Sequence, residues 1–312
     1  MKEIIPLVSI CCVVYNHEKF LKQCLEGFLM QQTEFDFEII VHDDASKDRS
    51  QSIIRDYCQQ YPALFRAILQ TENQFSQGRR ILPILLQNAR GKYFALCEGD
   101  DYWTDPLKLQ KQVDYMEKHD DCYMSTHASF WEVDGNLVTR GCQYEDERDL
   151  TTDEVIRNGG LYLATASLIF RRELLDSKPQ WMKKADIGDY PLQIWGSVRG
   201  KLHYFPQQMC VYRYQVPGSW TDNLRKTGIN TQHLLTEVAW LKSFDEETKH
   251  QYSEAVYSHL LPFCRELYYS KQISVFEYLR ALRKSQPHSF LLFLFQKFFT
   301  RLGAFFKRLF GI

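Results

Sequence analysis

The chain has 312 residues, of which 45% are hydrophobic and 25% are charged, close to the usage of ordinary globular proteins. This composition excludes wholesale disorder and a membrane protein with many spans. The 38 basic residues balance 39 acidic ones, so the whole chain has no strong attraction to nucleic acid and we expect no nucleic-acid partner.

The cysteines and the first residues bear on the cellular compartment. Nine cysteines occur without a CxxC pair, which is typical of reduced thiols. Residues 1–6 lack the basic and apolar regions of a secretory signal. We therefore expect a cytoplasmic protein.

The first part of the chain alternates between predicted strands and helices. Apolar runs predict four strands, at 7–14, 37–41, 67–70 and 93–97. Apolar residues at helical spacing predict intervening helices, at 18–31, 50–61 and 81–89. This alternation predicts an α/β fold, with a parallel sheet covered by helices on both faces.

Beyond residue 103 the pattern changes to a mixed one. We expect a helix at 107–119, and strands over 122–138 and 161–170 that flank a turn at 134–136 and extend the sheet. Periodic apolar positions over 231–285 predict two or three helices.

The last segment, 286–312, has the pattern of a basic amphipathic helix. Its helical stripe carries four cations and no acid, and Phe and Leu cover the rest. Its uncharged stretches are shorter than the about 20 apolar residues that cross a bilayer. The pattern favours a membrane-surface anchor, and packing on the core or on a second subunit is the alternative.

Polar residues follow three of the predicted strands. They are Tyr15-Asn16, Asp43-Asp44 and the acidic cluster of Glu98, Asp100 and Asp101. Because ligands of parallel sheets collect at the carboxyl ends of strands, we expect these clusters to converge on one site.

The acidic cluster predicts a metal site. Three acids within four residues repel one another unless a cation or solvent compensates them. A divalent cation held by carboxylates stabilises the charge that builds on a departing diphosphate. A solvated acidic turn is the alternative interpretation.

Five motifs occur in order, at 6–10, 15–16, 38–48, 91–93 and 98–103. Together they resemble the inverting family 2 glycosyltransferases of bacterial surface-polysaccharide synthesis, over about residues 6–220. The resemblance implies a GT-A domain at 1–225, with a Rossmann-like mixed sheet and helices on both faces. A C-terminal helical region, with an extension at 226–285, would follow it.

The resemblance also assigns roles at the strand ends. It implies that Mn²⁺ or Mg²⁺ and the donor diphosphate lie at Asp100 and Asp101. The nucleotide would lie beside Tyr15, Asn16 and the pair Asp43-Asp44. A carboxylate can accept the uracil N–H, and an aromatic ring can stack on the base. The alternative for the aspartate pair is an Asx turn or helix cap, and for Tyr15 it is packing.

The resemblance implies a general base at Asp189, which would take the proton of the acceptor hydroxyl. Asp186 is the competing candidate, and helix capping is the alternative role.

A loop around 211–220 resembles the family's segment that closes over the donor. It brings Arg213 and Trp220 into the predicted donor site, and Arg80 with its neighbour Arg79 could neutralise a diphosphate or be solvated. Gln215 stands in a region where many relatives have His, so a metal ligand from this loop is in doubt. Glu98 stands where Asp is usual, and we expect it to reach metal-bound water or the donor ribose.

The sequence thus predicts a metal-dependent inverting glycosyltransferase that uses a nucleotide-sugar donor, favoured as a UDP-sugar. The expected acceptor is a glycan or a lipid-linked sugar, at the inner face of the cell membrane. Two alternatives remain: a nucleotidyltransferase on a related fold, and an inactive membrane-associated scaffold.

Overall fold

The computed structural model describes residues 5–176, 178–185, 188–228 and 230–285. The predicted amphipathic segment 286–312 and the candidate base Asp186 lie outside the described residues. The chain divides into two compact units. The first consists of Met1–Val155, Gly160–Pro179 and Ile187–Gly228, and the second of Ile156–Gly159, Gln180–Asp186 and Ile229–Ile312.

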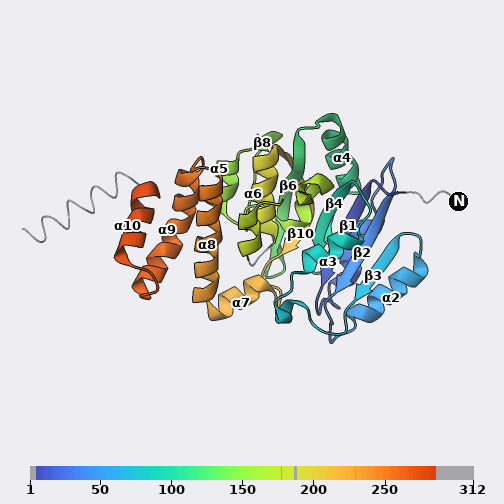
Figure 1. Ribbon diagram of the computed structural model, residues 1–312. Helices are drawn as coiled ribbons and strands as arrows, with labels where there is room; N and C mark the ends of the chain where they lie inside the picture. The colour runs from blue at the N-terminus through green and yellow to red at the C-terminus, as the bar shows by residue number, and fades with distance from the viewer. Residues whose placement is uncertain (1–4, 177, 186–187, 229, 286–312) are drawn as a thin grey trace, which may run out of the picture. The chain divides into compact units, whose positions relative to one another are not determined.

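The first unit begins with a parallel sheet, whose strands are buried on both faces and therefore appear as continuous apolar runs. Its strands lie in the order β3-β2-β1-β4 (Figure 1). They are β1 (Val8–Val14), β2 (Phe37–Asp43), β3 (Phe65–Leu69) and β4 (Tyr93–Glu98). The connecting helices are α1 (Leu21–Leu29), α2 (Ser50–Gln60) and α3 (Ile81–Asn88), with a 3₁₀ turn η1 (Phe75–Gln77). The predicted strands and helices of this part are confirmed.

The sheet then continues as a mixed sheet, in the order β4-β9-β6-β10-β5. Its strands are β5 (Tyr102–Trp103), β6 (Cys122–Val133), β7 (Asn136–Thr139), β8 (Arg148–Leu150), β9 (Ile169–Arg171) and β10 (Lys201–Arg213). Helices α4 (Lys108–Lys118), α5 (Thr152–Asn158), α6 (Asp189–Arg199) and α7 (Trp220–Thr227) accompany them, with short 3₁₀ turns η2 (Thr165–Ser167) and η3 (Arg172–Leu175). The predicted turn is confirmed, since β6 and β7 form a hairpin in which Asp134 and Gly135 have φ angles of 51° and 78°.

The strand expected over 161–170 is wrong for most of its length. The chain runs through η2 and becomes a strand at Ile169, where β9 pairs with β4 and β6. A short apolar run indicates burial, but it does not distinguish a strand from a buried irregular segment. The sequence also did not predict β10, in which polar residues interrupt the apolar pattern and the pairing with β6 shifts register between Phe205 and Cys210.

The second unit is helical. It contains η4 (Gln180–Lys184), α8 (Thr231–Glu247), α9 (Ser253–Tyr269) and α10 (Val275–Ser285), and α9 packs against both α8 and α10 (Figure 1). Trp181 of η4 stacks on Trp240 at 5.7 Å between ring centroids. The expected two or three helices over 231–285 are confirmed as three. No helix in the described part of the chain is both long and apolar enough to cross a bilayer.

The strand order places the three polar clusters side by side. Strand β1 lies between β2 and β4, with Val14 opposite Asp43 and Val13 opposite Glu98. The residues after Val14, Asp43 and Glu98 therefore leave the sheet at the same edge. The expected convergence of these strand ends is confirmed.

Candidate active site

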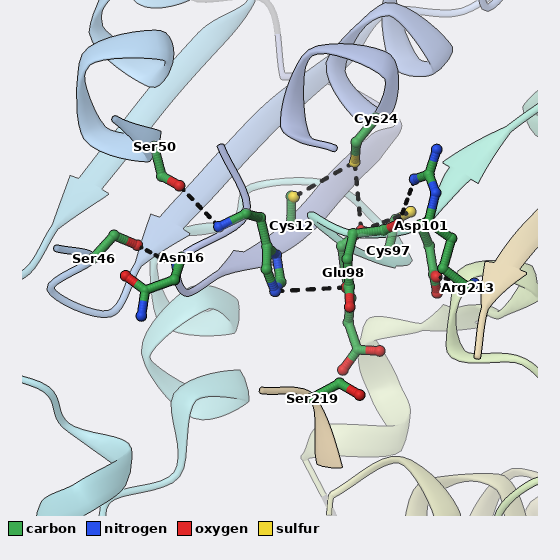
Figure 2. A network of polar contacts seen from close by, with 12 residues as sticks. Cys12, Asn16, Cys24, Ser46, Ser50, Cys97, Glu98, Asp101, Arg213 and Ser219 are labelled. Atoms are coloured by element: carbon green, nitrogen blue, oxygen red, sulfur yellow. Dashed lines mark hydrogen bonds and ion pairs between the residues drawn. The ribbon is translucent and has the colours of Figure 1, made fainter. Parts of the chain in front are cut away.

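The acidic turn, residues 98–101, leaves the end of β4 and is held by main-chain hydrogen bonds. The Gly99 N–H donates to the Val13 carbonyl at 2.8 Å, and the Asp101 N–H donates to the Glu98 carbonyl at 3.0 Å. Figure 2 shows Glu98 with the loop of Asn16 on one side and Asp101 with Arg213 on the other. The turn thus presents its acids at the edge where the strands end.

Gly99 allows this turn to lie close to β1. A Cβ atom at this position would lie 2.8 Å from Cγ2 of Val14 and 2.9 Å from Nδ1 of His17. Both distances are shorter than ordinary van der Waals contacts. Gly99 therefore occupies a position where a larger residue would collide with Val14 and His17.

The described protein groups compensate little of the negative charge that the acids of this turn would carry when ionised. Burial, together with the smaller effects of the carboxylates of Asp100 and Asp189, raises the pKa of Glu98 to about 8. Burial, Asp100 and Glu98 raise the pKa of Asp101 as well, while Arg213 lowers it. The Oδ2 atom of Asp101 is buried and has no hydrogen-bond partner in the described part of the chain. Such a cluster fits a bound cation.

Asp100 and Asp101 differ in what they can contact. Asp101 is fully buried, and its Oδ1 accepts the N–H of Arg213 at 2.8 Å. Asp100 keeps 8% of its surface exposed, and its Oδ1 lies 3.8 Å from Nε2 of His17. Asp100 is thus the more accessible of the two predicted metal ligands. Among the described residues, no ready group of three or more His, Cys, Asp or Glu side chains surrounds a cation position, so further ligands would come from the donor or from water.

The Arg213 side chain is occupied by protein groups. Its guanidinium donates to the Asp100 carbonyl, to Gln23 and to Glu132, the last at 3.2 Å. It also lies over the rings of Phe20 and Tyr102, at 4.9 and 4.5 Å from their centroids. These contacts make Arg213 a support for the acidic turn, and they do not favour the predicted contact with phosphate.

His17 is a residue that the sequence did not single out. Its main-chain N–H donates to the Ser50 hydroxyl oxygen at 2.9 Å, and its carbonyl accepts the N–H groups of Phe20 and Leu21 at the start of α1. The backbone therefore fixes the imidazole beside Asp100. Its place directly after the Tyr15-Asn16 motif is the signal that could have indicated it.

Tyr212 also lies near the acids. Burial raises the pKa of its hydroxyl, and the charges of Asp101, Glu98 and Asp100 raise it further. Tyr212 belongs to β10, so the unpredicted strand is the reason that the sequence did not place it here.

The predicted nucleotide residues lie at the ends of β1 and β2. Tyr15 is 39% exposed, and Asn16 has a φ angle of 58° with its side chain accepting the N–H of Lys47 at 2.8 Å. Asp43 accepts the N–H of Ser46 at 2.9 Å, as the alternative of an Asx turn expects. Its Oδ2 is buried and has no hydrogen-bond partner in the described part of the chain. The exposed Tyr15 ring is free to stack on a base.

Asp44 has a clear local role. Its two carboxylate oxygens accept the N–H groups of Gln74 and Phe75, at 2.7 and 3.0 Å. Asp44 therefore holds the turn that contains η1. Its contact with a nucleotide stays a prediction.

Asp189 is the first residue of α6, and its negative charge is one of the causes that raise the pKa of Glu98. The Thr165 hydroxyl donates to Oδ2 of Asp189 at 3.3 Å. The role of Asp189 as a general base stays a prediction.

The remaining predicted donor residues are less defined. Arg80 is exposed before α3, and its charge acts on Lys178. Trp220 begins α7, but its side chain lies outside the described residues. Gln215 has a φ angle of 61°, and its N–H is held by the Thr221 hydroxyl at 3.0 Å. The roles of Arg80 and Trp220 stay predictions.

The raised pKa of Glu98 predicts a dependence of stability on pH in metal-free protein. A carboxyl with an ordinary pKa of 4.5 and a folded-state pKa of about 8 stabilises the fold below pH 4.5, and it loses this contribution as the pH rises to about 8. Glu98→Gln removes the ionisation. Thermal unfolding in EDTA should therefore show the variant gaining stability relative to wild type between pH 5 and pH 8. Glu34→Gln, a change at an exposed residue, serves as the control and should differ from wild type in unfolding temperature by the same amount at both pH values. The same behaviour of Glu98→Gln would contradict the prediction.

Comparison with known proteins gives the family. The model for glycosyl transferase family 2 matches residues 9–177. The protein Rv1520 of Mycobacterium tuberculosis H37Rv is 37% identical over 217 residues, which are 68% of this chain and 60% of that protein. The glycosyltransferase EpsJ of Bacillus subtilis is 39% identical over 103 residues, 33% of this chain and 28% of EpsJ. The chain thus spans less than two thirds of the length of these relatives.

Solved structures show the same fold at low sequence identity. S. aureus TarS 1–349 in complex with UDP-GlcNAc has a TM-score of 0.63 at 18% identity, over 88% of this chain and 79% of TarS 1–349. The mannosyltransferase PcManGT from Pyrobaculum calidifontis, in complex with GDP-Man and Mn²⁺, has a TM-score of 0.52 at 15% identity, over 90% and 81% of the two chains. The expected GT-A fold with a C-terminal helical region is confirmed. This chain belongs to glycosyl transferase family 2.

Proposed function

We propose that the enzyme transfers a sugar from a nucleoside diphosphate sugar, in the first instance a UDP-sugar, with inversion at the anomeric carbon. The observation that carries this proposal is the uncompensated acidic turn at the carboxyl end of β4, with Asp189 close to it. The complexes of TarS with UDP-GlcNAc and of PcManGT with GDP-Man and Mn²⁺ support a nucleotide-sugar donor and a bound cation.

Asp100 would hold Mn²⁺ or Mg²⁺ through its carboxylate, and Glu98 would contact metal-bound water or the donor ribose. When bound, the cation neutralises charge on the departing diphosphate. Asp101 and Arg213 hold the turn from the protein side, because the Asp101 carboxylate and the Asp100 carbonyl both accept hydrogen bonds from Arg213. Preorganisation of this kind reduces the motion needed during the reaction.

Asp189 would accept the proton of the acceptor hydroxyl as its oxygen attacks the anomeric carbon. The sugar–phosphate bond breaks, and the nucleoside diphosphate leaves with the bonding electron pair. The Thr165 hydroxyl orients the Asp189 carboxylate.

The base of the donor would lie at the ends of β1 and β2, against the exposed ring of Tyr15. Asn16 and Asp43 shape this region through the hydrogen bonds that hold residues 46 and 47. The acceptor would be a glycan or a lipid-linked sugar of cell-surface polysaccharide synthesis. The basic sequence of 286–312 supports a cytoplasmic enzyme that is bound peripherally to the inner face of the membrane.

Product analysis tests this proposal. Incubation with UDP-GlcNAc, other UDP-sugars and GDP-mannose in Mn²⁺ should release a nucleoside diphosphate from at least one donor, and EDTA should abolish the release. Pyrophosphate as the product from nucleoside triphosphate and sugar phosphate would identify a nucleotidyltransferase instead. Absence of metal-dependent UDP or GDP binding in calorimetry would favour the inactive scaffold.

A further inference from the structure

The outer face of α10 combines exposed aromatic and cationic side chains. Phe276 is 80% exposed and Tyr269, at the end of α9, is 72% exposed. Val275 beside them is 39% exposed. These three are the exposed large hydrophobic residues of the second unit within its described part. A soluble helix pair normally buries such side chains.

Helical spacing places the cations on the same face as Phe276. Phe276, Arg280 and Arg283 lie at i, i+4 and i+7 and are all exposed, so they form one stripe along the helix. The residues Ala281, Leu282 and Ser285 are buried, and α10 packs against α9 (Figure 1). We refer to Tyr269, Phe276, Arg280 and Arg283 as the aromatic-basic face.

The charge of this face is positive. No ion pair joins Arg280 or Arg283 to another residue of the described chain. The acid on this helix, Glu277, lies 3.6 Å from Lys242 and accepts hydrogen bonds from Ser274, so its charge is already compensated. Lys271, in the turn between α9 and α10, is exposed and adds a further cation next to Tyr269.

We infer that the aromatic-basic face docks on a membrane surface that contains anionic lipid, an inference that rests on the proposed work at a membrane. Arginine heads bind lipid phosphates, and aromatic rings occupy the boundary between headgroups and acyl chains. The chain continues directly from α10 into 286–312, whose sequence adds four cations, no acid and many Phe and Leu residues. The same chemistry therefore extends from the described helix along the rest of the chain, which favours a lipid surface over a protein partner.

Vesicle sedimentation with the full-length protein tests this inference. Wild type should bind vesicles containing phosphatidylglycerol more tightly than vesicles of phosphatidylcholine alone, and added salt should weaken the binding. Each cation near an anionic surface contributes about fivefold in affinity, so Arg280→Gln combined with Arg283→Gln should weaken binding by about 25-fold. Phe276→Ser should weaken it further, while Phe276→Trp should retain it.

Matched controls lie on the first unit. Arg55→Gln and Leu137→Ser remove an exposed cation and a 53% exposed apolar side chain, and both should leave vesicle binding unchanged. Unchanged binding in the Arg280 and Arg283 variants would overturn the inference. The inference would also be overturned if wild type formed an oligomer that those variants lost while they kept vesicle binding, because the aromatic-basic face would then bind protein. Donor hydrolysis in solution should be equal in all variants, and its absence in wild type would instead count against the proposed function.

Discussion

Asp100→Asn is expected to lower metal-dependent release of nucleoside diphosphate by about 10²- to 10³-fold, the range seen when one charge-stabilising group of an active site is removed. The substitution keeps the shape of the side chain but removes the charge of the accessible carboxylate in the acidic turn. Calorimetric titration with Mn²⁺ in the presence of UDP should show a matching loss of metal affinity. The fold should persist, because Arg213 binds the main-chain carbonyl of Asp100 and not its carboxylate.

The matched control for Asp100→Asn is Asp114→Asn, a conservative change on the exposed side of α4, where Asp114 accepts a hydrogen bond from Gln110. This control should retain wild-type rates and wild-type metal affinity. If Asp100→Asn keeps full activity with UDP and Mn²⁺ bound as in wild type, the acidic turn does not hold the cation.

Asp189→Asn is expected to lower the rate of sugar transfer by about 10²- to 10⁴-fold, the range of general-base catalysis, because an amide cannot take the acceptor proton. Binding of UDP and Mn²⁺ should change by less than about twofold, since the carboxylate lies at the start of α6 and outside the proposed metal ligands. A steady-state assay with donor and acceptor, combined with calorimetry, separates these two quantities.

Thr165→Val provides a second test of the same base. Without the hydroxyl that donates to Asp189 at 3.3 Å, the ionised carboxylate loses a hydrogen bond, so the acidic limb of the pH–rate profile should move to higher pH. Asp176→Asn, on an exposed turn of the first unit, should leave the profile unchanged. A normal transfer rate in Asp189→Asn would exclude this residue as the base.

Arg213, which holds the acidic turn, links the parallel part of the sheet to its mixed part. Arg213 ends β10 and contacts both Asp100 and Asp101, which are 113 and 112 positions away in sequence. Strand β5, directly after the turn, pairs with β10 at Tyr102 and Val211. The mixed part of the sheet thus positions the carboxylates that leave its parallel part.

The sequence by itself determined the parallel half of the fold and the acids at its edge. Continuous apolar runs identify strands that are buried on both faces, and polar residues directly after them mark the ends of β1, β2 and β4. These are local features, because strand ends and short motifs occupy consecutive residues. The helices of the second unit were predictable for the same reason, from the periodicity of their apolar positions.

The tertiary structure alone decided how the site is supported and which groups face it. It placed His17 beside Asp100, gave Asp44 a turn-holding role, and directed the Arg213 guanidinium to protein groups. It also left Asp100 8% exposed and Asp101 fully buried, although the two are neighbours in sequence. These contacts depend on strand order and on β10, whose interrupted apolar pattern carries no local signal, so they arise only when distant segments pack together.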